Sequence, residues 1–472
     1  MVYSGAVRNW LWVTIGLSAV LLVAGAAYLD APGLLEGPAS WWRVGVSFTG
    51  HAMLLLAWWQ LGPRWHRPLA TAALWSLPML VALPLHSRDA YAYAATGWQV
   101  ARRINPYENA LGEAGQAGLL VGTHWHTTTS VYPSLQLDLF GLVSRLTDGD
   151  VLATPMAMRA QSVLALVILS WVLPRLARRF GVDEQLALWA GVLNPVILVQ
   201  WIGGAHNDAL MVALGVAAFL AVTDLGWRGW RGLVVAGLLL GTAMGIKQSA
   251  ALYGLGVVAV AWSLRRGRGP SWWRLALVAA VPGAVTVLTF LATSFTWGLG
   301  WRNPTAGNPI GATSNSPLSW VASFFRYHEV FPEGVSDRGI NLVSTLLIGA
   351  AVIWLWVRWG PKGRTTADRP WLFTLAVLVA FMVFAPALQP WYLTWLLPLY
   401  VFCPRTVVAD RVWLIMVAAF ALLPALQDTL PPYVAMPIVA VPLWWVWRWM
   451  EMGPAADSGE DQGLIRRPGA LR

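Results

Sequence analysis

The residues best suited to chemistry gather in one polar stretch, 86–133, inside an otherwise apolar chain. Asp89 opens this stretch directly after an apolar run that stops at Leu85, and tyrosines, arginines, two histidines and Glu108 follow it. A carboxylate at the edge of an apolar region is a candidate general base. The alternative role for Asp89 is a helix N-cap, worth about 1 kcal/mol, because the sequence predicts a helix at 90–103. One side chain can serve both purposes.

Three more polar groups interrupt apolar runs further along the chain. His206, Asn207 and Asp208 precede one apolar run, Lys247 stands between two others, and the segment 389–392 reads Gln-Pro-Trp-Tyr. Their alternative roles are helix capping, snorkelling into the membrane interface and an ordinary interfacial turn with belt aromatics. As substrate contacts, a lysine would supply a point charge for phosphate and aromatic rings would stack on a sugar. The residues we expect to bind phosphate or substrate beside the base Asp89 are Arg88, Tyr91, Tyr107, His206, Asn207, Asp208, Lys247, Gln389, Trp391 and Tyr392.

The sequence predicts no dedicated metal site. His124 and His126 are spaced by one residue without a carboxylate or cysteine partner, so a zinc site is not expected. A divalent cation shared by Asp89, Glu108 and Asp208 is compatible with the sequence, although the spacing of these residues does not require one. No cofactor is therefore assigned.

Composition places the chain in a lipid bilayer. Hydrophobic residues make up 57% of the sequence, charged residues only 11%, and the mean hydropathy is +0.57. A span takes about 20 apolar residues, and the apolar runs predict about 14 spans. The formal charge of +10 comes from arginines scattered between the runs, with only Lys247 and Lys362 as lysines. This positive-inside pattern does not form a basic face, so nucleic acid is not an expected partner.

The same charge pattern predicts the topology. Arg8 precedes the first span and keeps the N-terminus in the cytoplasm of a multi-pass plasma-membrane protein. The alternation then brings Asp89, His206, Lys247 and Gln389 to the extracytoplasmic face. We expect a single transmembrane domain, 1–450, with an extracytoplasmic catalytic loop at 86–147 that contains interfacial helices at 90–103 and 134–147. A second extracytoplasmic loop is expected at 298–339 and a disordered cytoplasmic tail at 451–472.

The absence of three common motifs argues against several classes of enzyme and transporter. It has no phosphate loop ending in GKT or GKS, no HExxH helix and no GxSxG elbow. ATP-driven transport, zinc proteolysis and serine hydrolysis therefore lose support. An outward-facing membrane enzyme can use a lipid-phosphate sugar, whose phosphate leaves readily. Transfer of that sugar needs one base for the acceptor hydroxyl, not the acid–base pair of a hydrolase.

At these residues the chain resembles the GT-C glycosyltransferases. Asp89 is followed by Tyr91-x-Tyr93, Gly97, Asn105-Pro106-Tyr107 and Tyr132-Pro133, while Gly203 to Ala209 reads GGAHNDA after Asn194-Pro195. Together with 389–392 and Lys247, this constellation is most similar to the polyprenyl-phosphate-mannose-dependent α-1,6-mannosyltransferases of actinobacterial envelope synthesis. It covers most of residues 70–400. Ser130 to Ser134 departs from it, because the group usually has Pro-Tyr-Gly-Pro there.

The resemblance implies an all-α GT-C-type helical bundle with Asp89 as the base. We expect an inverting glycosyltransferase that moves a hexose, with mannose as the expected sugar, from a polyprenyl phosphate to an envelope glycan or glycolipid. The rival is a lipid or oligosaccharide transporter or flippase, which favours charges near the middle of spans and broken helices in matching halves. An inactive membrane scaffold would not need polar side chains that converge from distant spans.

Overall fold

The computed structural model describes residues 2–28, 41–224, 230–264, 271–302, 316–331, 335–361, 369–427, 430 and 432–452. Within these ranges the chain is helical and contains no strand. The prediction of an all-α, multi-span membrane protein is confirmed. Residues 303–315 and 332–334 of the predicted second loop, and the predicted tail from residue 453 onward, lie outside the described residues.

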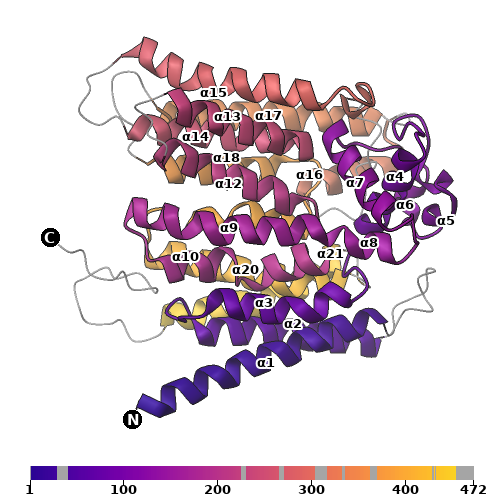
Figure 1. Ribbon diagram of the computed structural model, residues 1–472. Coiled ribbons are helices and arrows are strands. Elements are labelled where there is room, and N and C mark those ends of the chain that lie inside the picture. Colours follow the sequence, from indigo (N-terminus) through magenta and orange to yellow (C-terminus); the bar gives the residue numbers. More distant parts are fainter. Residues whose placement is uncertain are drawn as a thin grey trace.

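The long helices lie side by side and run between two ends of the molecule (Figure 1). They are α1 (Val2–Tyr28), α2 (Trp41–Leu61), α3 (Pro68–Val81), α9 (Arg159–Phe180), α12 (Asp208–Asp224), α13 (Trp230–Ile246), α14 (Ala251–Ser263), α15 (Trp272–Thr293), α17 (Val335–Trp359), α18 (Pro370–Phe384), α20 (Val407–Gln427) and α21 (Pro432–Met452). Between them lie α10 (Glu184–Gly191), α11 (Pro195–Ile197), a π-helical turn η3 (Leu198–Gly203), the 3₁₀ turns η4 (Gln248–Ala250), η5 (Gly300–Arg302) and η6 (Pro390–Trp395), the helix α16 (Pro317–Tyr327) and α19 (Leu397–Tyr400).

Among the described residues, five helices are long and apolar enough to cross a membrane, and the bent pair Glu184–Gly191 with Pro195–Gly203 adds a sixth. Shorter apolar helices of 10–17 residues, such as Pro68–Val81 and Pro370–Phe384, lie among them. The predicted count of about 14 spans includes these shorter helices and stays a prediction.

The predicted catalytic loop folds into a cap of short helices at one end of the bundle, on the right of Figure 1, while α1 begins at the other end. The cap contains α4 (Asp89–Ala101), η2 (Leu111–Glu113), α5 (Gly115–Gly118), α6 (Thr123–His126), α7 (Ser134–Leu146) and α8 (Ala153–Ala157). The helices predicted at 90–103 and 134–147 correspond to α4 and α7. These two pack so closely that a Cβ on Gly97 would lie 2.4 Å from the carbonyl oxygen of Phe140. Any side chain at position 97 would therefore prevent α4 and α7 from packing this closely.

A stripe of glycines brings the cap close to the bundle. Gly237 and Gly241 of α13 face α15, where a Cβ on Gly241 would lie 2.6 Å from the carbonyl of Thr286. One turn later, a Cβ on Gly245 would lie 2.8 Å from the side chain of Leu135 in α7. Small residues at this spacing let membrane helices approach each other closely. The carboxyl end of α13, next to Lys247, is thereby held against the cap.

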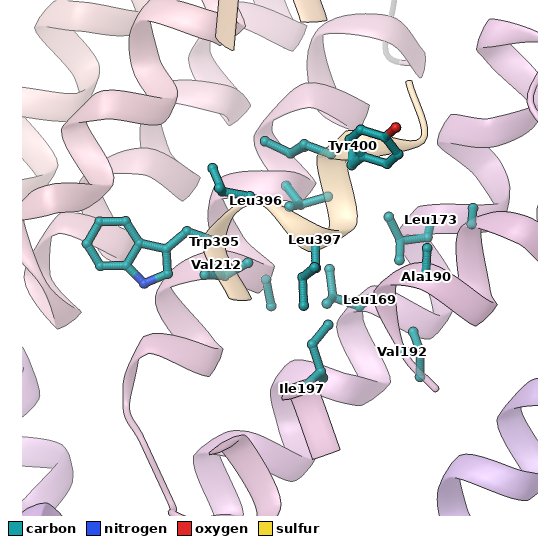
Figure 2. Packing of buried hydrophobic residues seen from close by; sticks show 14 of the residues in the cluster. Leu169, Leu173, Ala190, Val192, Ile197, Val212, Trp395, Leu396, Leu397 and Tyr400 are labelled. Atoms are coloured by element: carbon teal, nitrogen blue, oxygen red, sulfur yellow. The ribbon is translucent and has the colours of Figure 1, made fainter. Parts of the chain in front are cut away.

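An irregular segment fills the centre of the bundle, where the sequence predicted a continuous span at 392–403. Residues 390–400 form a 3₁₀ turn and one short helix instead of a continuous span. Figure 2 shows Leu397 pointing toward Leu169 and Ile197, while Trp395 points to the other side of the segment. The segment therefore joins the buried core to the polar groups around Trp395.

Candidate active site

Asp89 begins α4, but its side chain does not cap that helix. The N-cap residue is Arg88, and the Asp89 amide donates to Ser87 Oγ at 3.1 Å. The carboxylate instead accepts from the Trp125 indole N–H at 3.3 Å (Oδ1) and from the Tyr93 hydroxyl at 3.5 Å (Oδ2). His206 Nδ1 lies 3.6 Å from Oδ2. None of these contacts caps α4, so Asp89 remains a candidate for the base.

Burial sets the acidity of Asp89. The residue is 8% exposed, and this burial raises the pKa of Asp89 from 3.8 to about 6, with Lys247 lowering it and Asp208 raising it. Lys247 and Asp208 therefore lie close enough to Asp89 for their charges to change its pKa. At neutral pH the carboxylate is ionised, and its pKa is close enough to neutrality for it to take up a proton efficiently.

His206 is fixed by a tight turn between η3 and α12. Ala205 has a φ of +57°, which is uncommon for a residue with a Cβ. A Cβ on Gly204 would lie 2.8 Å from the imidazole, and Trp391 stacks on the ring with centroids 3.7 Å apart. Burial first, and then the charges of Lys247 and His86, hold the pKa of His206 well below its usual range. The imidazole is therefore neutral beside Asp89.

Lys247 has a carboxylate partner and does not snorkel. Its Nζ lies 2.9 Å from both carboxylate oxygens of Asp208, a residue that is 0% exposed. The Trp395 indole N–H donates to the same carboxylate at 2.7 Å. The ammonium also lies 4.8 Å from the ring centroid of Tyr392, within cation–π range. Lys247 faces the site as one half of an ion pair, not as a lone cation.

Tyrosines connect the remaining predicted residues. The Tyr93 hydroxyl donates to Asn207 Oδ1 at 3.3 Å, and the Tyr132 hydroxyl donates to the Tyr93 oxygen at 3.4 Å. Tyr107 donates to the backbone carbonyl of Tyr132 at 2.6 Å and packs on Gly300. Tyr107 therefore braces the cap against the start of the second loop, and the structure gives it no place beside the Asp89 carboxylate.

Other predicted residues are not drawn into this cluster. Tyr91 lies on the side of α4 that is influenced by Arg88 and Arg159, and Gln389 makes no side-chain hydrogen bond to the cluster among the described residues. Glu108 is exposed and accepts from Asn105 at 2.8 Å, so it does not approach Asp208. In the described part of the chain, no three His, Cys, Asp or Glu side chains form a group that could hold a metal ion.

The structure adds three residues that the sequence did not single out. Trp125 and Trp395 donate to the two carboxylates, as described above. Arg159 is 2% exposed and donates to the carbonyls of Ile202 (2.6 Å) and Gly203 (3.1 Å) at the end of η3. The Gly203 carbonyl also accepts from the Leu85 amide at 3.0 Å. Arg159 therefore fixes the turn before His206 against the segment that leads to Asp89.

Known proteins resemble this chain over most of its length. Residues 6–265 match the family described as alpha-(1->6)-mannopyranosyltransferase, N-terminal domain. The chain is 30% identical to alpha-(1->6)-mannopyranosyltransferase A of Mycobacterium tuberculosis over 449 residues, covering 82% of this chain and 80% of that protein. The chain belongs to the alpha-(1->6)-mannopyranosyltransferase family.

Two relatives from Corynebacterium glutamicum extend the comparison. The chain is 27% identical to alpha-(1->6)-mannopyranosyltransferase A of that organism, covering 74% of this chain and 76% of the relative. It is 26% identical to alpha-(1->6)-mannopyranosyltransferase B, covering 61% of this chain and 54% of the relative. The resemblance inferred from the motifs is thus confirmed at the level of the family. The region that matches the family contains Asp89, the 203–208 turn and Lys247, whereas Trp391 and Trp395 lie beyond it.

Proposed function

We propose that this member of the family transfers mannose from a polyprenyl-phosphate donor to a hydroxyl of an envelope glycan or glycolipid, at the extracytoplasmic face of the plasma membrane. The observation that carries the proposal is a buried carboxylate, Asp89, held only by contacts of 3.3 Å or longer beside His206 at one end of a helical bundle. The names of the relatives, all alpha-(1->6)-mannopyranosyltransferases, support mannose as the sugar and an α-(1→6) linkage as the product.

In this mechanism Asp89 removes the proton from the acceptor hydroxyl as its oxygen attacks C1 of the mannose. The new bond from C1 to the acceptor oxygen forms while the bond from C1 to the phosphate oxygen breaks. The electron pair leaves with the lipid phosphate, and the proton stays on Asp89 Oδ1 or Oδ2. A direct displacement inverts C1, so an α-linked product requires a β-linked donor.

Lys247 supports the departure of the phosphate from a fixed position. Its ammonium is held by Asp208 and faces Tyr392, so it needs no reorganisation during the reaction. The positive charge is partly compensated by Asp208, which suits a contact that must bind the donor and later release the lipid phosphate. Trp391, stacked on His206, offers a neighbouring ring for the sugar.

The cavity beside Asp89 indicates how the acceptor enters. Asp89, Tyr93, Thr96, Trp125 and Tyr132 are among the residues that line a space of about 10 Å³, enough for roughly one water. A sugar does not fit there without movement. We infer that α6 moves outward and that the acceptor hydroxyl replaces the Trp125 indole at the Asp89 carboxylate.

The arrangement favours an enzyme over the rival transporter. A transporter keeps its binding site near the middle of the bilayer, whereas Asp89, His206 and Lys247 lie at the end of the bundle that carries the cap. The bent pair α10–η3 has no matching broken pair among the described helices.

The test is sugar transfer by the purified protein in liposomes from polyprenyl-phosphate mannose, with and without a chelator. The Asp89→Asn variant is expected to lose transfer, while Asp138→Asn, a change in the same cap at a residue bound to Trp297, retains it. Equal activity of Asp89→Asn and the unmodified protein would remove Asp89 as the base. Transfer from a nucleotide sugar but not from the lipid phosphate would overturn the donor.

A further inference from the structure

A second cavity lies at the end of the bundle opposite the cap. It has a volume of about 260 Å³ and lies where the carboxyl end of α9, the start of α10 and the start of α18 meet residues 401–405. The turn between α9 and α10 is at the end of the bundle where α1 begins (Figure 1). A volume more than ten times the ~10–15 Å³ that one water needs can take a small polar group together with part of an apolar chain.

The apolar part of the wall comes from three segments that are distant in the sequence. Phe180 ends α9, Trp371 belongs to the first turn of α18, and Phe402 follows α19. Trp371 and Phe402 stack with centroids 4.7 Å apart, and Phe180 contacts Trp371 edge-on at 5.0 Å. This aromatic wall provides a surface for the glycerol and first methylene groups of a lipid.

The polar part of the wall contains donors without acceptors. The Trp371 indole is buried and its Nε1 has no hydrogen-bond partner among the described residues, although a buried indole N–H usually finds one. Arg369, at the N-cap of α18, is exposed and has no carboxylate within 4 Å in the described part of the chain. In the first turn of α18, Pro370 has no N–H and the Phe373 amide donates to the Arg369 carbonyl at 2.9 Å, which leaves the Trp371 and Leu372 amides without a partner inside the helix. Arg369 and Trp371 both line the cavity, and donors at a helix N-terminus suit an anion.

The remaining charged groups of the wall are already engaged. Arg405 makes a two-point contact with Asp410, at 3.0 and 2.8 Å. Asp183 accepts from the Leu186 amide at 2.8 Å as the N-cap of α10. Since Arg405 is paired with Asp410 and Asp183 caps α10, Arg369 is the cation left for one anionic group among the described residues of the wall.

We propose that this cavity, which we call the α9–α18 cavity, binds the phosphodiester head group of a membrane phospholipid. Arg369, the Trp371 indole and the first turn of α18 hold the phosphate, and the aromatic wall holds the adjoining glycerol. The site is independent of the sugar-transfer site because it lies at the other end of the bundle. Its occupant fastens α18, which leads to Trp391, to α9 and α10, which lead to His206.

The experiment measures the rise in Tm that added ligand gives to the purified, delipidated protein in detergent. The ligands are short-chain phosphatidylglycerol, diacylglycerol with the same chains, and inorganic phosphate. Binding to the folded state alone raises stability by RT ln(1 + [L]/Kd), so the rise in Tm grows with ligand concentration. We expect phosphatidylglycerol to raise Tm and diacylglycerol to have little effect. An equal rise with inorganic phosphate at the same concentration would overturn the lipid assignment.

Variants locate the effect in the cavity. Arg369→Gln should weaken the apparent affinity for phosphatidylglycerol about tenfold, as expected for a hydrogen bond to a charged group. Trp371→Phe keeps a smaller aromatic ring, removes the N–H and should weaken affinity about fivefold. Arg358→Gln, at the last turn of α17 and outside the cavity wall, is the matched control and should leave it unchanged. Equal responses in all three variants would refute the site.

Discussion

Asp89→Asn tests the base because the structure predicts opposite effects on stability and on activity. Burial raises the pKa of Asp89 from 3.8 to about 6, so the folded state holds the proton more tightly than the unfolded state. The stability that protonation contributes is complete below pH 3.8 and is lost as the pH rises through about 6. At about 1.36 kcal/mol per pH unit, ionised Asp89 costs the folded protein roughly 3 kcal/mol at pH 8.

Asparagine is neutral at every pH and avoids this cost. Its side-chain oxygen can still accept from the Trp125 indole. For 472 residues, the entropy of unfolding is on the order of 1 kcal/mol per degree, so Asp89→Asn should raise Tm by ~3 °C at pH 8. The gain should shrink toward zero near pH 4, where Asp89 is protonated. Sugar transfer should nevertheless fall about 10²–10⁴-fold, the usual contribution of a general base.

Thermal unfolding in detergent between pH 4 and 8, together with kcat/KM for transfer over the same range, measures both effects. In the unmodified protein, kcat/KM should fall about tenfold per pH unit below about pH 6, where the base becomes protonated. Asp138→Asn controls for a change in the cap itself. A variant at position 89 that unfolds earlier than the unmodified protein at pH 8, and whose activity falls in step with its stability, would show that Asp89 only holds the fold.

Three other substitutions give separate tests. Lys247→Met should destabilise the protein by about 3–5 kcal/mol because it leaves Asp208 charged and buried, and the double variant with Asp208→Asn should recover much of this in a denaturation assay. Trp125→Phe removes a hydrogen bond that lowers the pKa of Asp89, so the acid limb of the kcat/KM profile should move to higher pH; an unmoved limb would contradict that contact. Gly204→Ala should displace His206 and cost about 1–3 kcal/mol with reduced transfer, whereas Gly283→Ala, which has open space around its Cβ position, should retain both stability and activity.

The sequence predicted features that depend on local pattern. A long polar break in an apolar chain indicated a cap with helices at 90–103 and 134–147, and the structure has α4 and α7 there. The charge alternation indicated that 134–147 does not cross the membrane. In that topology α9 begins on the side of the cap and has Arg178 and Arg179 in its last turn, on the opposite side. The positions of the two helices are confirmed, because helical length is set within each segment, whereas the side of the membrane on which they lie stays a prediction.

The partners inside the site could not be predicted in the same way. Lys247 was expected to meet a ligand phosphate, yet it pairs with Asp208, 39 residues away along the chain. Arg159 was given no role from the sequence, although it fixes the turn before His206. Such contacts depend on how distant helices pack, and no periodicity within one segment encodes them. The GGAHND pattern was still informative, because Gly204 leaves the space that the His206 ring occupies.

The two carboxylates of the site differ in how strongly they are bound, and this decides which of them acts. Asp208 has three contacts of 2.7–2.9 Å, from Lys247 and Trp395, so its oxygens are committed and removing it breaks a buried ion pair. Asp89 has contacts of only 3.3, 3.5 and 3.6 Å, which leaves its lone pairs free to take a proton from an incoming hydroxyl. A base must be accessible to its proton as well as suitably acidic. Loss of charge at position 208 should therefore be detected first as loss of stability, and loss of charge at position 89 as loss of chemistry in a protein that still folds.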